Sequence, residues 1–206
     1  MNSPALMPTV FVVDDDPALR TALNSLLRSV GMQVFTYASG AEFLQHPFED
    51  APACLILDVR LQGESGLDFQ VRLTELKVSM PIIFVSGHGD IAMSVKAMKA
   101  GALDFLVKPF RDQDLLDAVS VALQEDGVRR ETGKFAADLQ ARFQTLTARE
   151  QEVMALAVTG LMNKQIASEI GLSEITVKIH RGHAMKKMQA KTFADLVKMS
   201  EALAGS

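Results

Sequence analysis

The chain has 206 residues, of which 48% are apolar, and a formal net charge of −4. These values are those of a globular protein with one large or two small domains. Cys54 is the only cysteine, which excludes an internal disulfide and favours a reducing cytoplasm. Its place in the apolar run ACLILD predicts a packing role. No apolar run approaches the roughly 20 residues that span a bilayer, so we expect a cytoplasmic protein without a membrane partner.

The charge is divided unevenly along the chain. Residues 1–124 carry 9 basic and 15 acidic side chains, whereas residues 125–206 carry 12 basic and 10 acidic ones. An acidic front and a basic back predict two domains with different partners.

The front of the chain alternates short apolar runs with amphipathic stretches. The apolar runs predict strands at about 9–14, 32–37, 53–59, 81–86 and 103–108, with helical patterns at 17–30, 39–46, 66–78, 90–100 and 111–124. Such alternation predicts a parallel sheet covered by helices on both faces. We therefore expect an α/β doubly wound, five-stranded, flavodoxin-like fold.

Polar residues stand where these predicted strands end. Asp14 and Asp15 end the first strand, Asp58 the third, Ser86 the fourth and Lys108 the fifth. Asp16 has a simpler explanation, because Pro17 and a helical pattern follow it and make it a helix N-cap. In a doubly wound sheet the carboxyl ends of the strands meet at one edge, which is where sites form.

The groups at this edge favour phosphoryl chemistry. Three carboxylates suit Mg²⁺, or Mn²⁺ in its place. An ammonium such as Lys108 can neutralise a phosphoryl group and a hydroxyl such as Ser86 can hydrogen-bond to it. One carboxylate can then act as the nucleophile, and Asp58 is the best candidate because its strand is central.

The motifs VVDDD, LILDVR, FVSGHGD and LVKPF occur in the order found in the receiver domains of two-component response regulators. Residues 8–124 resemble that family, and GHGDIAMSVKAMKAGALDFLVKPF resembles its FixJ subgroup. The resemblance implies that Asp58 is the phosphoacceptor and that Asp15, Asp58 and the Arg60 carbonyl hold Mg²⁺ with Asp14 nearby. It also implies phosphate sensing by Ser86 and Lys108, a switch role for Phe105 and a cis Lys108–Pro109 bond.

The loop after Asp58 departs from the family pattern. It reads LQGESG, where a proline and a hydrophobic residue are usual, so the rigidity of the loop is in question. Arg60 and His88 stand two residues beyond Asp58 and Ser86. Our hypothesis is that they set the lifetime of the phosphate, although His88 could equally be a loop residue without a role.

Residues 125–145 form a polar stretch in which Gly127 and Gly133 precede a helical pattern. We expect a linker that is partly or wholly helical. It could also be one long helix that continues from the last helix of the front domain, since glycines only lower that tendency.

Residues 146–206 predict four helices. Thr147 with Glu150 three residues later forms a capping box for the first, and Asn163 is the expected cap of the second. Gly171 ends the second helix and Ser173 begins the third, which gives a helix-turn-helix pattern. Thr192 begins the last.

A projection of the third helix at about 100° per residue separates two faces. Val177, Ala184 and Met188 fall on the inner face, whereas basic residues dominate the outer one. This outer stripe suits the major groove of DNA. The predicted DNA contacts are Lys164, Thr176, Lys178, Ile179, Arg181, His183 and Lys186; Arg181 projects near the buried side and would have to reach around it.

The same residues resemble a LuxR-type DNA-binding domain, in which Lys178 to Lys186 would belong to the recognition helix and the last helix would mediate dimer contacts. Gly182 departs from that pattern, because a long or polar side chain is common there.

Together these features predict a DNA-binding transcriptional regulator controlled by phosphorylation of Asp58, with no catalysis beyond its own phosphorylation and dephosphorylation. The expected partners are a sensor histidine kinase, double-stranded DNA and, after phosphorylation, a second copy of the chain; RNA polymerase is a further candidate. Two alternatives remain. The back half could bind a protein instead of DNA, or the chain could be an aspartyl-phosphate phosphatase of the haloacid dehalogenase type. The phosphatase needs a second acid two residues after the nucleophile, where Arg60 stands.

Overall fold

The computed structural model describes residues 7–87 and 91–204. The chain divides into two compact units, one extending to Arg130 and the other beginning at Glu131. We describe each unit by itself.

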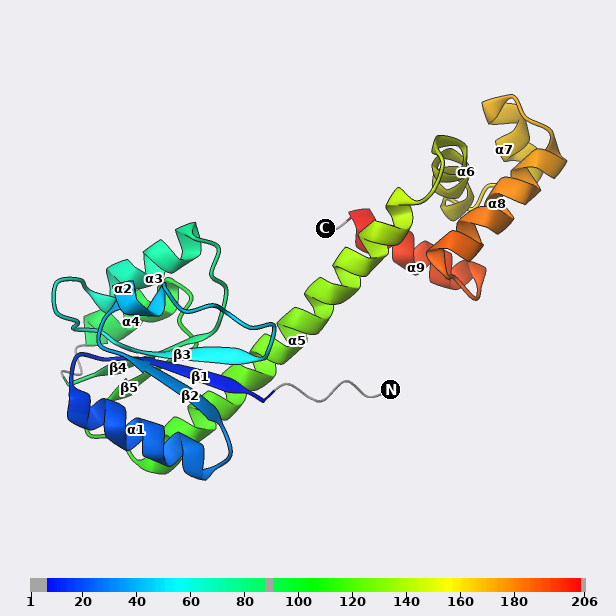
Figure 1. Ribbon diagram of the computed structural model, residues 1–206. Helices are drawn as coiled ribbons and strands as arrows, with labels where there is room; N and C mark the ends of the chain where they lie inside the picture. Colours follow the sequence, from blue (N-terminus) through cyan, green and yellow to red (C-terminus); the bar gives the residue numbers. More distant parts are fainter. Residues whose placement is uncertain (1–6, 88–90, 205–206) are drawn as a thin grey trace. The chain divides into compact units, whose positions relative to one another are not determined.

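The first unit is a parallel sheet with helices on both faces (Figure 1). Its strands pair in the order β2-β1-β3-β4-β5, which confirms the predicted doubly wound, flavodoxin-like sheet. The elements are β1 (Thr9–Val13), α1 (Pro17–Ser29), β2 (Gln33–Tyr37), α2 (Gly40–Phe43), β3 (Ala53–Asp58), α3 (Gly66–Glu75), β4 (Ile82–Ser86), α4 (Ile91–Lys99), β5 (Asp104–Val107) and α5 (Asp112–Gln144).

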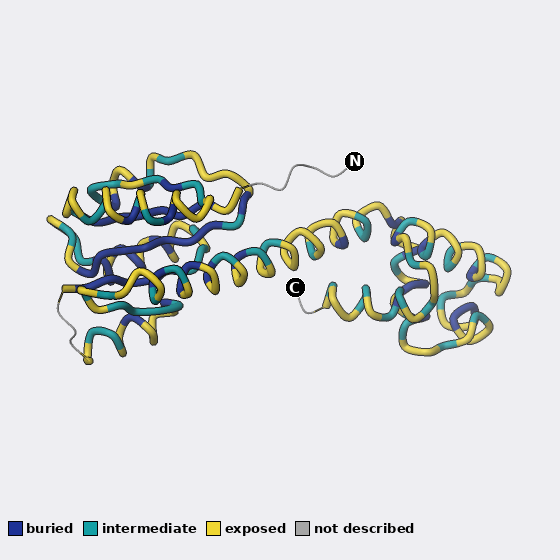
Figure 2. The backbone as a smooth tube through the Cα atoms, turned by 90° about the horizontal axis from the view of Figure 1, so that it is seen from below, coloured by how far each residue is buried: buried dark blue, intermediate teal, exposed yellow. Residues whose placement is uncertain are grey.

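Each face of the sheet has its own hydrophobic core. On one face Leu23 and Leu27 of α1 and Val119 of α5 pack against the strands, and on the other Phe43 of α2 and Phe69 of α3 do so. The central strands β1, β3 and β4 are buried along their whole length (Figure 2). Burial on both faces explains why these strands are continuous apolar runs.

Local sequence sets the start of α1 as predicted. The Asp16 carboxylate accepts a hydrogen bond from the Ala18 amide at 2.9 Å, and Pro17 is the first helical residue. Because Asp16 caps α1, only Asp14 and Asp15 of the three aspartates can contribute to a site at the edge of the sheet.

α5 continues as one helix to Gln144, so Gly127 and Gly133 do not interrupt it. In the first unit its buried Asp126 carboxylate accepts a hydrogen bond from the Ala53 amide at 2.9 Å and one from Arg130 at 2.5 Å. The bond from Ala53 fixes α5 to the first residue of β3, whereas Arg130 lies one turn further along α5 itself. The pairing of Asp126 with Arg129 and Arg130 supplies the compensation that a buried carboxylate needs.

The second unit holds the end of α5 and four further helices. These are α6 (Ala148–Val158), α7 (Asn163–Ile170), α8 (Glu174–Met188) and α9 (Phe193–Ala204). Gly171 ends α7 in the left-handed conformation, with φ at +68°, and the chain then turns into α8. Val177, Ala184 and Met188 of α8 are buried in the core of the unit, as the helical projection predicts.

The helix caps of the second unit agree with the sequence at α6 but not at α7. At α6 the Thr147 hydroxyl and the Glu150 carboxylate form the predicted capping box. The prediction that Asn163 caps α7 is wrong, because Met162 occupies that position. The Asn163 side chain instead accepts a hydrogen bond from Arg181 at 3.1 Å, and Gln165 accepts one from the Met162 amide at 2.8 Å.

Among the described residues, no helix combines the length and apolar character needed to cross a membrane.

The loop after β3 depends on a close approach at Gly66. A Cβ atom at this position would lie 2.2 Å from the Asp58 carbonyl oxygen, whereas one at Gly127 would meet nothing within 4 Å. We expect Gly66→Ala to lower the free energy of unfolding by about 1–3 kcal/mol and Gly127→Ala to raise it by about 0.5–1 kcal/mol. Urea unfolding followed by circular dichroism measures both, and equal stability of the two variants would contradict this account.

Candidate functional site

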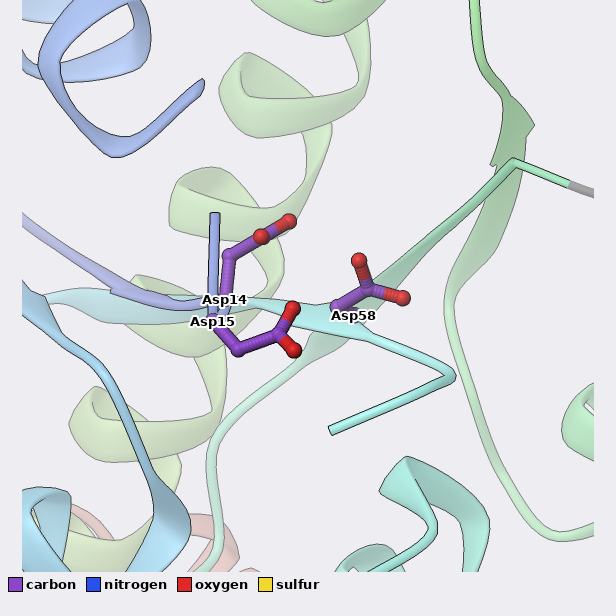
Figure 3. Close-up of side chains that lie close together, drawn as sticks. All are labelled: Asp14, Asp15 and Asp58. Atoms are coloured by element: carbon purple, nitrogen blue, oxygen red, sulfur yellow. The ribbon is translucent and has the colours of Figure 1, made fainter. Parts of the chain in front are cut away.

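The sheet brings the predicted polar residues to its carboxyl edge. Asp14 directly follows β1, Asp58 and Ser86 are the last residues of β3 and β4, and Lys108 directly follows β5. Backbone hydrogen bonds continue past the strands, for example from the Lys108 amide to the Ser86 carbonyl at 2.7 Å. The Asp14, Asp15 and Asp58 side chains gather beyond the ends of β1 and β3 (Figure 3).

Lys108 bridges two of these carboxylates. Its Nζ lies 2.7 Å from Asp14 Oδ2 and 2.5 Å from Asp58 Oδ2. The Asp14 side chain is fully buried and 10% of the Asp58 side chain is exposed. At such depth two neighbouring carboxylates repel each other strongly, and the ammonium that both contact reduces this repulsion.

The second oxygen of each carboxylate is held by a backbone amide. Asp14 Oδ1 accepts from Asp16 and Asp58 Oδ1 accepts from Arg60, each at 2.8 Å. The Arg20 guanidinium also donates to the Asp14 carbonyl oxygen at 2.6 Å. Arg20 could not be predicted as part of this edge, because one basic residue in the first turns of an amphipathic helix carries no distinctive signal.

The electrostatics of the edge are set by burial and by this bridge. Burial raises the pKa of Asp14 above its ordinary value, and the Lys108 hydrogen bond offsets only part of that effect. Burial by itself would lower the pKa of Lys108, but hydrogen bonds to Asp14 and Asp58 outweigh it, so that its pKa is raised. Lys108 is therefore charged throughout the physiological range.

The same edge fits a divalent cation. Oxygen atoms of Asp14, Asp15 and Asp58 all lie within 4.8 Å of one another, and Asp15 is partly open to solvent. Carboxylate oxygens with room for water are the ligands that hard cations prefer. The donor set therefore suits a hard divalent metal ion.

The loop after Asp58 is closed by its own contacts. Arg60 and Ser65 form an antiparallel bridge, and the Gly66 amide donates to the Val59 carbonyl at 2.9 Å. These bonds constrain the loop without the proline that is usual in the resembling family. Phe105 on β5 is half-buried with its ring centroid 6.4 Å from that of Phe84, and Lys108–Pro109 is cis. His88 lies outside the described residues.

The second unit places most of the predicted DNA contacts at its surface. Lys178, Ile179, His183 and Lys186 are exposed along α8, and Lys164 is exposed on α7. Thr176 is half-buried, and its hydroxyl lies 2.7 Å from Ser173 Oγ at the start of α8. The outward side chains therefore form a basic strip interrupted by an isoleucine.

Arg181, which is predicted to contact DNA, makes its contacts inside its own domain. Its guanidinium lies over the Phe193 ring, 4.2 Å from the centroid, and donates to Asn163. It thereby links α8 to α7 and α9 inside the domain. Its helical position near the buried side explains this, because the shortest path for its side chain leads to neighbouring helices.

Glu150 links α6 to α8 through its side chain. Its carboxylate accepts a hydrogen bond from Lys187 at 2.6 Å and lies 3.5 Å from His183 Nδ1. The Lys187 hydrogen bond is the largest cause that lowers the pKa of Glu150 to about 2. The capping role of Glu150 was predictable from its spacing to Thr147, but its partner on α8 was not, because 37 residues separate the two.

Comparison with known families assigns both halves of the chain. Residues 10–120 match the response regulator receiver domain. Residues 144–200 match the bacterial regulatory proteins of the luxR family.

Curated relatives share both halves. Nodulation protein W of Bradyrhizobium diazoefficiens is 58% identical, covering 94% of this chain and 86% of its own. Response regulator protein TmoT of Ectopseudomonas mendocina is 47% identical over 96% of this chain and 90% of its own, and transcriptional regulatory protein FixJ of Rhizobium meliloti is 39% identical over 96% of both.

Solved structures extend the likeness to the fold. Response regulator StyR has a TM-score of 0.87 at 47% identity, covering 95% of this chain and 98% of its own. Full-length FixJ from B. japonicum has a TM-score of 0.57 at 35% identity, covering 96% and 98%. The chain therefore belongs to the two-component response regulators that join a receiver domain to a LuxR-type DNA-binding domain.

Proposed function

We propose that phosphorylation of Asp58 by a sensor histidine kinase controls the binding of this transcriptional regulator to DNA. The observation that carries the proposal is the Lys108 bridge between Asp14 and Asp58, at 2.7 and 2.5 Å. It holds the nucleophile and a charge-neutralising group together at the edge of the sheet. Any change in charge on Asp58 must disturb this bridge.

The transfer step requires only positioning from the protein. A carboxylate oxygen of Asp58 forms a bond to phosphorus as the bond between phosphorus and the imidazole nitrogen of the donor breaks. That nitrogen keeps the electron pair and takes up a proton from water, so that the donor leaves with a neutral imidazole. Asp58 is held for this attack by the Arg60 amide and the Lys108 ammonium. The same residues serve when the acyl phosphate is hydrolysed, and no further catalysis is proposed.

Mg²⁺, or Mn²⁺, is the proposed cofactor of this step. Asp15, Asp58 and the Arg60 carbonyl would hold the ion, with Asp14 next to it. The clustered oxygens of the three aspartates support this assignment. When bound, the ion would neutralise charge on the transferring phosphoryl group.

Phosphorylation would redistribute the charges at the edge. A phosphoryl group carries a charge of about −1.5 to −2 near neutral pH, and the buried Asp14 carboxylate already competes for Lys108. We propose that Lys108 and Ser86 turn toward the phosphoryl oxygens and that Phe105 follows on β5. Ser86 is buried at the end of β4, next to the Lys108 backbone.

Dimerisation through α4 and β5 is the proposed consequence. Ile91, Val95 and Met98 follow one another at helical spacing on α4 and are exposed, as is Val107 on β5. Exposed apolar residues gathered in this way are typical of an interface. The phosphorylated dimer would then present two copies of α8 to paired half-sites, and it could contact RNA polymerase in the cytoplasm.

The first test compares wild type with Asp58→Asn, using acetyl phosphate and Mg²⁺ as phosphodonor and cofactor. We expect phosphorylation of wild type alone, together with dimer formation in sedimentation and an affinity for DNA that rises at least tenfold. The asparagine keeps the shape of the side chain but cannot accept a phosphoryl group.

Equal DNA binding by both proteins in every condition would contradict the proposed control. Binding that does not weaken as salt is raised would favour a protein partner for the second unit instead, since phosphate contacts give a steep dependence on salt.

The second prediction concerns Asp14. Its pKa is raised by burial, so its ionised form destabilises the fold at neutral pH. We expect Asp14→Asn to raise the melting temperature at pH 7, and this gain to disappear as the pH falls below the ordinary value of 3.8. The same variant should bind Mg²⁺ roughly tenfold to a hundredfold more weakly.

Thermal unfolding with and without Mg²⁺ at both pH values measures these effects. The proposed role of Asp14 would be wrong if the variant were less stable than wild type at pH 7, or if it bound Mg²⁺ as tightly as wild type does.

A further inference from the structure

The outward face of α8 carries two isoleucines and a glycine in addition to its basic residues. At about 100° per residue, Ile175, Lys178, Ile179, Gly182, His183 and Lys186 share this face, and all six are exposed. The opposite face is buried in the core of the domain. Whatever covers the outward face must therefore come from outside the domain.

Two large apolar side chains lie at the beginning of this face. Ile175 is 74% exposed and Ile179 is 51% exposed. They are four residues apart, so they lie side by side on the helix surface. Apolar side chains gathered at an exposed site mark a place of contact, and in the major groove of DNA the apolar feature is the C5-methyl group of thymine.

Gly182 lies near the middle of the same face. A Cβ atom there would meet nothing within 4 Å, so nothing within the domain calls for a glycine. A glycine inside a helix also weakens the helix. The feature that would justify it is a close approach of another molecule to the helix backbone.

The charges around these residues favour DNA over a protein as that molecule. Lys178 and Lys186 share the face with the isoleucines, and Lys164 is exposed on α7. A surface that carries apolar residues beside ammonium groups matches a groove with methyl groups on its floor and phosphates on its walls.

We propose that α8 reads thymine methyl groups: Ile175 and Ile179 pack against the C5-methyl groups of thymines in each half-site, and Gly182 lets the helix backbone come close enough for this contact. The inference rests on the proposed binding of DNA by α8. It adds which feature of the base sequence is read, and by which residues.

Deoxyuridine provides a direct test, because it lacks only the methyl group of thymine and keeps the same hydrogen-bonding groups. Duplexes that bind the full, phosphorylated chain are selected from a random pool, and each thymine is then replaced in turn by deoxyuridine. We expect a loss of three- to tenfold in affinity at specific positions of each half-site for wild type. For Ile175→Ala the loss at its own position should disappear.

Lys178→Gln is the matched control on the same face. It should weaken binding to all duplexes and reduce the salt dependence, while the ratio between thymine and deoxyuridine duplexes stays as in wild type. Gly182→Ala gives an independent readout, because stability and binding should change in opposite directions. We expect its melting temperature to rise and its affinity for the selected duplex to fall at least fivefold.

Affinity that survives every replacement by deoxyuridine, or that is unchanged in Gly182→Ala, would overturn the inference while leaving DNA binding intact. If no duplex is enriched and the binding that occurs does not depend on salt, the proposed function fails and the inference fails with it.

Discussion

The ion pairs of Lys108 with Asp14 and Asp58 are the interaction on which the proposed control of the receiver domain depends. The parallel sheet sends the carboxyl ends of its strands to one edge, and there it places a fully buried carboxylate beside a nearly buried one. A single ammonium, which directly follows the last strand, pairs with both carboxylates but carries only one positive charge. Burying these carboxylates lowers the stability of the fold. Because they share one ammonium, a charge added to Asp58 changes the pairing of both.

Much of this arrangement could be predicted from the sequence. Continuous apolar runs ending in Asp14, Asp58, Ser86 and Lys108 are enough to place four polar groups at one edge of a doubly wound sheet. The capping pattern at Asp16 shows which of three adjacent aspartates is committed to the backbone. At these positions local chemistry and the fold point to the same answer.

The features that escaped prediction depend on contacts between residues far apart in the chain. Asp126 is buried against the start of β3, yet it lies in a polar stretch that reads as a linker. Lys187 and Arg181 belong to a basic segment, but one pairs with Glu150 and the other lies against Phe193. A charge count cannot separate basic residues that face outward from those that hold the domain together. The packing of α8 on its neighbours separates the two kinds of residue, because it leaves Ile175, Lys178 and Lys186 exposed to solvent.

The central claim is that Lys108 converts phosphorylation of Asp58 into a change elsewhere in the molecule. The most direct measurement is the DNA affinity of Lys108→Met after treatment with acetyl phosphate and Mg²⁺, with the phosphorylated fraction determined by intact mass. Our account predicts that the variant accepts a phosphoryl group more slowly, because Lys108 no longer holds Asp58. The phosphorylated variant should gain no affinity for DNA, because methionine cannot follow the phosphoryl charge. A gain equal to that of wild type at the same degree of phosphorylation would contradict it.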